Sequence, residues 1–147
     1  MAIRVLFLCT GNSARSQMAE GLLRAHGGDR FEIHSAGSEP AERVNPLAIA
    51  AMQELGYDIS AAYPKHLAQF LNDPWDYVIT VCDRARDVCP VFPGDHEQVH
   101  WGFDDPAAAE GTEEQRMRVF RRVRGEIDQR LKLFLNVAQE RRGLARP

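Results

Sequence analysis

The stretch from Cys9 to Ser16, which reads CTGNSARS, combines residue types that bind an oxyanion with one that attacks it. A cysteine thiolate is a nucleophile, and Arg15 offers a planar guanidinium that grips two oxygens of a tetrahedral anion. Gly11 and Asn12 tolerate positive φ, which lets a loop curl so that its N–H groups point inward. Ser16 is placed to donate a hydrogen bond to the cysteine sulfur. The segment therefore predicts an anion-binding loop with Cys9 as its nucleophile.

The residues on either side of this loop predict the elements that position it. Ile3 and Val5 to Leu8 form an apolar run that ends at Cys9, as expected for a central parallel strand covered on both faces. A helix should follow, because apolar residues recur at near-helical spacing until Gly27 and Gly28. The residues of this stripe are Ala14, Met18, Leu22 and Ala25.

A loop between a buried strand and a helix is a typical place for an anion site. Ligands of open α/β sheets bind at the carboxyl ends of the strands, and the N-terminus of a helix adds partial positive charge. The alternative is that Cys9 is an inert buried residue, since free cysteine is among the most buried residue types. That alternative leaves the small and cationic residues of the loop unexplained.

The middle of the chain continues the alternation of strands and helices. Phe31 to Ser35 alternates in polarity like a strand, and Asn45 and Pro46 are suited to begin a helix that runs to Leu55 before Gly56. Three shorter elements follow in the sequence. They are a short helix over 66–71, a strand over 76–81 that ends at Cys82, and a strand over 99–101.

The C-terminal part predicts one long amphipathic helix. Thr112 to Gln115 fits a capping box, and an apolar stripe follows at steps of three and four. The stripe consists of Met117, Phe120, Val123, Ile127, Leu131, Phe134 and Ala138. We expect an α/β single-domain three-layer sandwich over residues 1–140, with a four-stranded, mainly parallel sheet and helices on both faces. Residues 141–147 are expected to form a frayed tail.

Composition narrows the classes of function. The chain has 147 residues, enough for one domain with its own core, and a formal net charge of -3 argues against a nucleic-acid partner. No apolar run reaches the length of a membrane span, and the N-terminal run is too short for a signal peptide, so we expect a cytoplasmic protein. Three cysteines in a reducing compartment do not indicate a disulfide framework, so each needs another explanation.

The motif from Cys9 to Gly21, CTGNSARSQMAEG, resembles the catalytic loop of the low-molecular-weight protein tyrosine phosphatase superfamily. It is especially similar to the thioredoxin-coupled arsenate reductases built on that fold. Two downstream cysteines, Cys82 and Cys89, and an Asp-Pro-Ala sequence at Asp105 favour the reductases over the phosphatases. The other similar segments are Ser35–Gly37, Asn45–Pro46, Asp58–Ser60, Val78–Pro90 and His100–Ala107.

The resemblance implies a role for each site residue. Cys9 would attack arsenic, Arg15 would hold the arsenate oxygens, and Asp105 would be the general acid that protonates the departing oxygen. The backbone N–H groups of the loop would also bind these oxygens, and they belong to Thr10, Gly11, Asn12, Ser13, Ala14, Arg15 and Ser16. Spacing alone does not choose Asp105 over Asp104, and a turn role beside Pro106 is the alternative.

The three cysteines fit a thiol relay. Cys82 would attack the arsenic adduct of Cys9, and Cys89 would then attack Cys82 and carry the disulfide outward to thioredoxin. If residues 83–89 are helical in the reduced protein, the seven-residue step from Cys82 to Cys89 rises about 10 Å along the helix. A disulfide allows roughly 4.4–6.8 Å between the two Cα atoms, so the segment would unwind on oxidation. One alternative is a zinc site formed by Cys82, Cys89 and a histidine, although the cysteine spacing is wider than usual. Another is that both cysteines are incidental buried residues.

Lys65 stands where some relatives are expected to carry an acidic residue that binds a monovalent cation. We hypothesise that its ammonium replaces the cation and supports Asn12 through Glu20 or Ser35. A solvent-exposed lysine without a role is the alternative.

These inferences together predict an arsenate reductase that uses no cofactor and no metal. Its substrate would be arsenate or a phosphate-like oxyanion, its reductant thioredoxin, and its oligomeric state a monomer. A low-molecular-weight protein tyrosine phosphatase that forms a phosphocysteine at Cys9 is one alternative. A non-catalytic oxyanion or redox sensor that signals through the segment from Cys82 to Cys89 is another.

Overall fold

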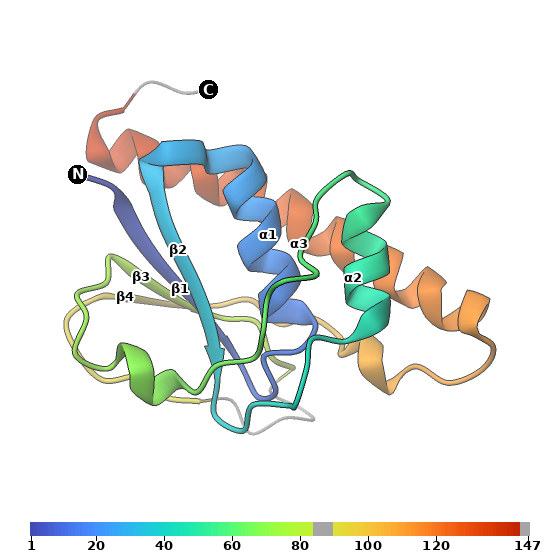
Figure 1. Cartoon of the computed structure of the whole chain (residues 1–147). Coiled ribbons are helices and arrows are strands. Elements are labelled where there is room, and N and C mark those ends of the chain that lie inside the picture. The colour runs from blue at the N-terminus through green and yellow to red at the C-terminus, as the bar shows by residue number, and fades with distance from the viewer. Residues whose placement is uncertain (84–89, 145–147) are drawn as a thin grey trace.

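The structure, a computed structural model, describes residues 1–83 and 90–144. Strands and helices alternate along the chain, as expected (Figure 1). The strands are β1 (Ile3–Cys9), β2 (Phe31–Gly37), β3 (Tyr77–Thr80) and β4 (Glu97–His100). The α-helices are α1 (Arg15–Gly27), α2 (Pro46–Gln53) and α3 (Glu113–Arg142). Three short 3₁₀ helices are η1 (Gly28–Arg30), η2 (Leu67–Phe70) and η3 (Pro106–Ala108).

The four strands form one parallel sheet in the order β2-β1-β3-β4. β1 is central, and its last residues pair with Gly37 of β2 on one side and with Thr80 of β3 on the other. The carboxyl ends of all four strands therefore meet at one edge of the sheet. The loop after Cys9 and the chain that leads to Cys82 both leave the sheet at this edge.

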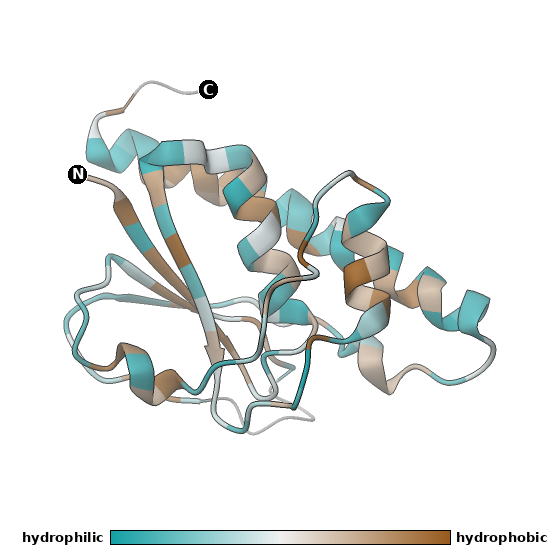
Figure 2. Ribbon diagram, viewed as in Figure 1, coloured by the Kyte–Doolittle hydropathy of each residue, from teal (hydrophilic) through white to brown (hydrophobic). Residues whose placement is uncertain are grey.

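Side chains that alternate along β1 enter two separate cores. Val5 and Phe7 belong to the larger core, which α1, α2 and α3 cover. Leu6 and Leu8 face the other side, where Phe70 of η2 belongs to the same cluster. Helices on both faces of the sheet confirm the predicted three-layer α/β fold. Figure 2 shows hydrophobic residues in brown along β1 and many hydrophilic residues in teal along α3.

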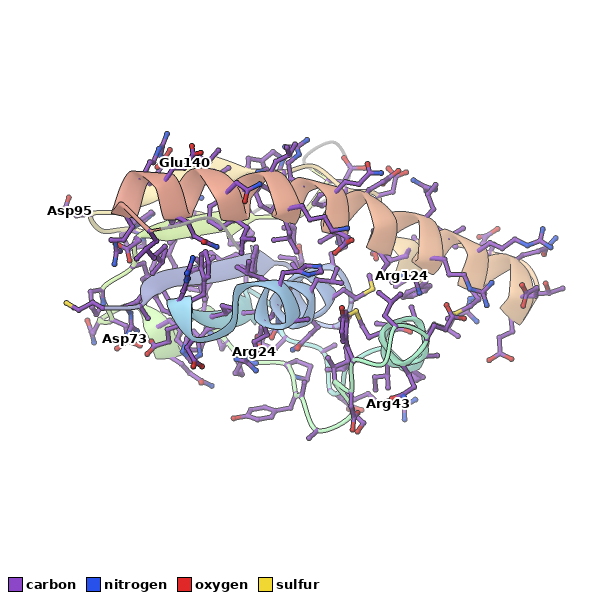
Figure 3. The ribbon with its side chains drawn as sticks, turned by 90° about the horizontal axis from the view of Figure 1, so that it is seen from above. Arg24, Arg43, Asp73, Asp95, Arg124 and Glu140 are labelled. Carbon is purple, nitrogen blue, oxygen red and sulfur yellow. The ribbon has the colours of Figure 1, made fainter. Side chains whose placement is uncertain are left out.

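Arginine side chains of α3 hold α2 against it. Arg121 forms an ion pair with Glu54 at 2.8 Å, and Arg124, which points toward α2 in Figure 3, donates to Ala51 O at 2.7 Å. The hydrogen bond from Arg121 is the largest cause that lowers the pKa of Glu54 to about 2. Within the part of the chain that the structure describes, α3 and the other helices lack the apolar length needed to cross a bilayer.

Several predicted details differ from the structure. Ala25 of the expected stripe on α1 is exposed, while Leu23 is fully buried, because α1 packs against both the sheet and α3 and so buries a wider face than one stripe. α2 ends at Gln53, two residues before the expected end. In contrast, the structure confirms the capping box predicted at Thr112, with which α3 begins.

The end of α3 lies further along the chain than expected. Residues 141 and 142 are helical instead of frayed, and the boundary predicted after residue 140 falls short. Arg141 forms an ion pair with Glu97 of β4, and Arg142 forms one with Asp76 at 2.9 Å. Gly143 then ends the helix in the left-handed conformation, with φ of 79°. The last turn of α3 thus continues past the apolar stripe, and its arginines pair with acidic residues at the edge of the sheet.

Candidate active site

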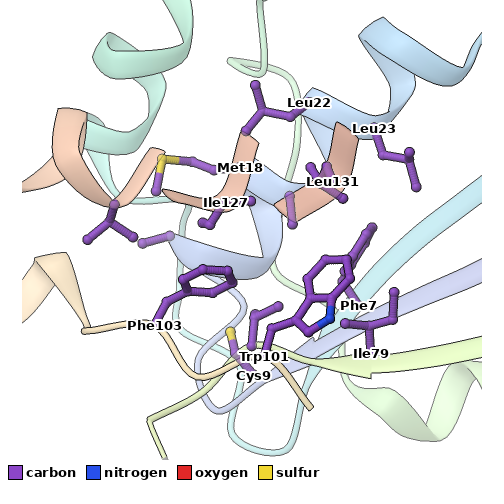
Figure 4. Close-up of a cluster of buried hydrophobic side chains, with 14 of the residues drawn as sticks. Phe7, Cys9, Met18, Leu22, Leu23, Ile79, Trp101, Phe103, Ile127 and Leu131 are labelled. Carbon is purple, nitrogen blue, oxygen red and sulfur yellow. The ribbon is translucent and has the colours of Figure 1, made fainter. Parts of the chain in front are cut away.

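Cys9 ends β1, and the loop of residues 10–14 leads directly into α1. Its side chain is buried at 2% exposure, and it is the free cysteine among the described residues. The Asn12 N–H donates to Cys9 Sγ at 3.2 Å, and Ser16 Oγ lies 2.9 Å from the same sulfur. Figure 4 shows Cys9 beside Phe103 and Trp101 at the margin of the core. The thiol therefore lies at the base of the loop with two hydrogen-bond partners, which can stabilise a thiolate.

Asn12 forms the tight bend of the loop. It has φ of 50°, in the left-handed region that residues other than glycine rarely adopt, and its side chain is fully buried. Its Nδ2 donates to Ser16 Oγ at 2.8 Å, and its Oδ1 accepts from the Lys65 N–H at 2.9 Å. Of the two residues that tolerate positive φ, Asn12 adopts it and Gly11 does not.

Arg15 lies at the start of α1 and faces a segment far along the chain. Its side chain is 5% exposed; Nη1 donates to Phe103 O at 3.2 Å, and Nη2 lies 3.8 Å from Asp105 Oδ2. The guanidinium thus connects the anion-binding loop with the segment that follows β4. A guanidinium held in this way is oriented before any oxyanion enters.

The two aspartates of the Asp-Asp-Pro sequence point in different directions. Asp105 Oδ1 accepts the Ala107 N–H at 3.0 Å and caps η3, while its Oδ2 faces Arg15. Asp104 instead forms an ion pair with Arg122 of α3 at 3.1 Å. Asp105 therefore fills the turn role and also lies beside the loop. Asp104 faces Arg122 and not the loop.

Cys82 lies close to the loop through the register of the sheet. Val81 N–H donates to Leu8 O at 2.9 Å, so Cys82 comes one residue after the position opposite Cys9. Cys82 is fully buried and disulfide-bonded. Cys89 and the predicted helical segment before it lie outside the described residues. The structure therefore places Cys9 and Cys82 at the same sheet edge.

Glu20 of α1 lies between Ser35 of β2 and the cavity that Lys65 lines. Ser35 Oγ donates to Glu20 Oε1 at 2.6 Å, and both side chains are buried. Glu20 and Lys65 line a cavity of about 460 Å³ between α1 and the segment from Tyr57 to Lys65. Burial lowers the pKa of Lys65, and the charge of Glu20 opposes this shift. The Lys65 ammonium donates to Tyr63 O at 2.9 Å. The main-chain N–H of Lys65 donates to Asn12 Oδ1, whereas the hypothesis from the sequence had the ammonium support Asn12 through Glu20 or Ser35.

Two residues that support the loop were not singled out from the sequence. Gln17 is buried and donates to Asn12, and Gly37 lies so close to the loop that a Cβ there would be 2.4 Å from Thr10 O. A polar residue on the buried side of a helix next to an anion loop is a signal that could have identified Gln17. For Gly37, the signal was a glycine at the end of a strand, in the Ser-Ala-Gly motif.

The fold and the loop define the class of protein. The chain belongs to the family described as low molecular weight phosphotyrosine protein phosphatase, whose model matches residues 4–143. This finding confirms the resemblance that the Cys9 motif indicated.

Within that family the chain is similar to proteins named arsenate reductase. One from Halalkalibacterium halodurans is 54% identical over 130 residues, which cover 88% of this chain and 93% of that protein. A solved arsenate reductase from Archaeoglobus fulgidus has a TM-score of 0.76 at 32% identity, with 90% of this chain and 98% of that chain covered. A thioredoxin-dependent arsenate reductase from Corynebacterium glutamicum has a TM-score of 0.71 at 33% identity and covers 94% of this chain and 62% of its own.

Proposed function

We propose that this protein reduces arsenate to arsenite through a relay of Cys9, Cys82 and Cys89, and that thioredoxin restores the thiols. The observation that carries the proposal is the position of Cys9 and Cys82 at the carboxyl ends of adjacent parallel strands, at the edge where the loop after Cys9 lies. A phosphatase needs the first cysteine alone, whereas a two-electron reduction needs a second thiol nearby. The named relatives support arsenate as the substrate.

The first step joins the substrate to the enzyme. Arg15 and the loop N–H groups hold the oxyanion while Cys9 Sγ attacks arsenic. An As–O bond breaks, and the oxygen leaves as water after it takes a proton from Asp105. The distance of 3.8 Å between Asp105 Oδ2 and Arg15 Nη2 supports this role, because it places the carboxyl beside the group that holds the anion.

The second step transfers the electrons. The Cys82 thiolate attacks Cys9 Sγ, and a disulfide forms as the S–As bond breaks. The electron pair of that bond stays on arsenic, which leaves as arsenite. Two thiols have then lost two electrons, and arsenic has changed from the +5 to the +3 state.

The third step moves the disulfide away from the buried site. Cys89 attacks Cys82 Sγ, so Cys9 becomes a free thiol again, and a dithiol of thioredoxin reduces the Cys82–Cys89 disulfide. A free Cys9 together with a disulfide-bonded Cys82 is the state that this step produces, which supports the relay. The thioredoxin-dependent relative supports the reductant. We expect a monomer that works in the cytoplasm, where thiols are kept reduced.

Parallel assays of two activities test the proposal. We expect Cys82→Ser and Cys89→Ser to abolish thioredoxin-coupled arsenate turnover while both keep the slow hydrolysis of an aryl phosphate, because that hydrolysis needs Cys9, Arg15 and Asp105 alone. Cys9→Ser should lose both activities. Arsenate turnover that survives in Cys82→Ser would refute the relay, and efficient aryl phosphate hydrolysis without arsenate reduction would instead favour the phosphatase of the wider family.

We further propose that the Lys65 ammonium supplies the positive charge beside Glu20 that a monovalent cation provides in some relatives. Lys65 and Glu20 line the same cavity, and the charge of Glu20 raises the pKa of Lys65 against the larger effect of burial, which supports this role. Arg24 also forms an ion pair with Glu20, at 3.0 Å. We expect the wild type to show no activation by potassium and Lys65→Ala to lose several-fold in kcat/KM, part of which potassium restores. Lys132→Ala, at the second lysine of the chain, is the control and should change nothing. Strong potassium activation of the wild type with no effect of Lys65→Ala would disprove the role.

A further inference from the structure

The side-chain amide of Gln17, on α1, contacts both the anion-binding loop and the segment of Tyr63. Its side chain is 1% exposed, and its amide nitrogen lies 3.2 Å from Asn12 O, 3.1 Å from Asn12 Oδ1 and 3.1 Å from Tyr63 O. All three neighbours are carbonyl-type oxygens, so the amide nitrogen serves as a donor only. We propose that Gln17 is a positioning residue that holds Asn12 in its left-handed conformation and thereby holds the Asn12 N–H on the sulfur of Cys9.

The conformation of Asn12 explains why such a clamp is useful. A residue other than glycine at φ of 50° is strained, and it persists where its surroundings over-determine it. The Asn12 N–H donates to Cys9 Sγ, while its carbonyl oxygen accepts from Gln17. A turn to a relaxed backbone conformation would move one or both of these groups. The bond to Gln17 therefore opposes the movement that would take the N–H away from the sulfur.

The same bond has a consequence for the next peptide group. In a planar trans peptide the carbonyl oxygen and the following N–H point in opposite directions. When Gln17 binds Asn12 O, the Ser13 N–H is directed away from Gln17. This orientation makes the Ser13 N–H available to an oxyanion on the other side of the loop. Gln17 would thus affect oxyanion affinity as well as the reactivity of Cys9.

Gln17 also connects the loop to a distant segment. Tyr63 O accepts from the Gln17 amide, and two residues later the Lys65 N–H donates to Asn12 Oδ1 at 2.9 Å. Asn12 is therefore held from α1 and from the segment of Tyr63 and Lys65 at once. Without the Gln17 amide, Asn12 Oδ1 keeps the Lys65 N–H and Tyr63 O keeps the Lys65 ammonium, so Asn12 O is the acceptor that depends most on Gln17.

The reactivity of Cys9 provides a direct test, which rests on its proposed role as the nucleophile. In a Cys82→Ser, Cys89→Ser background, Cys9 is the single cysteine, and its alkylation by iodoacetamide is followed as a function of pH with and without inorganic phosphate. We expect Gln17→Met to slow alkylation at neutral pH and to weaken protection by phosphate, each about five- to tenfold. Gln17→Glu should have a larger effect, because a carboxylate repels all three oxygens.

Two comparisons separate positioning from general loss of structure. Gln139→Met is the matched control, since Gln139 is also a glutamine at 1% exposure but contacts Arg30, so alkylation should be unchanged. In an Asn12→Gly background, where glycine adopts positive φ without help, the effect of Gln17→Met should shrink to less than about twofold.

The proposal is overturned if folded Gln17→Met alkylates and binds phosphate like the wild type, or if its effect persists in full beside Asn12→Gly. Should Gln17→Met not fold, Gln17→Asn, whose amide is one methylene short of Asn12, gives the same readings. Because alkylation involves no arsenate, a failure of arsenate reduction in the wild type would refute the proposed function and leave this test unaffected.

Discussion

Two segments that meet at Arg15 are held in place by different kinds of interaction. Cys9, Asn12 and Ser16 of the loop are buried, and the hydrogen bonds among their side chains run between buried groups. The segment from Gly102 to Ala108 contains Asp105, whose side chain is one-third exposed, and is tied to α3 by the surface ion pair of Asp104 with Arg122. The candidate nucleophile, Cys9, is therefore fixed more firmly than the candidate acid, Asp105.

This difference matches the demands of the two tasks. An anion cradle lowers a barrier when its donors need no rearrangement as charge develops, which favours buried and fully bonded groups. A general acid must exchange protons with water between turnovers, so partial exposure is an advantage. Substitutions in the loop should therefore have large effects, and substitutions around the acid segment should have smaller ones.

Arg15→Lys should produce the largest loss. A lysine keeps the charge but cannot bind two oxygens at once, and it loses the bond to Phe103 O that holds the guanidinium. We expect kcat/KM for arsenate to fall at least about a hundredfold. Steady-state kinetics with thioredoxin coupling measures this, and Arg118→Lys on the exposed face of α3 is the control. A loss below about fivefold would contradict the view that the loop is pre-organised around Arg15.

Asp105→Asn should produce the next largest loss, and mainly in kcat. Asparagine can still accept the Ala107 N–H and cap η3, so the segment keeps its shape while the transferable proton is lost. We expect kcat to fall about a hundredfold with little change in KM. Alkylation of Cys9 should proceed as in the wild type. Asp104→Asn is the matched control, because that carboxylate faces Arg122. Equal losses in the two variants would show that the site does not distinguish them.

The same contrast explains which parts of the molecule could be predicted from sequence. The strand before Cys9 and the capping box of α3 depend on neighbouring residues, so local patterns were enough to predict them. The contact of Arg15 with Phe103 joins residues that are 88 positions apart, and no spacing pattern encodes it. The choice between Asp104 and Asp105 depended on this long-range geometry as well.

The supports of the loop were missed for a related reason. Gln17 bonds both the main-chain and the side-chain oxygen of Asn12, and Gly37 lies against Thr10 O. The contacts with main-chain oxygens carry no signal in the residue types of the partners. The bond from Lys65 to Asn12 uses the main-chain N–H, which the identity of residue 65 does not reveal. Residue types were enough to propose a chemistry for the site, whereas the packing behind it required the fold.

Gly37→Ala should destabilise the loop from outside. The added Cβ would lie 2.4 Å from Thr10 O, which is a backbone atom and cannot rotate away. We expect the free energy of unfolding to fall by about 1–3 kcal/mol, with weaker phosphate binding, as measured by denaturant unfolding and by protection of Cys9. Gly125→Ala in α3 is the control, because a Cβ there meets open space, and it should be neutral or stabilising. Unchanged stability in Gly37→Ala would mean that the loop yields more easily than its bonds suggest.

Arg122→Gln should have the smallest effect and tests the acid segment itself. Arg122 contacts Asp104 at 3.1 Å and Glu126 at 3.0 Å, but its side chain is 47% exposed, so solvent screens both pairs. We expect kcat to change about twofold or less, and the difference from the wild type to shrink at high salt. The measurement is kcat at low and high ionic strength, with Arg118→Gln as the control on the same helix. A loss as large as that of Asp105→Asn would show that the acid segment depends on this ion pair for its position, and the distinction between a firmly held loop and a loosely held acid would then be wrong.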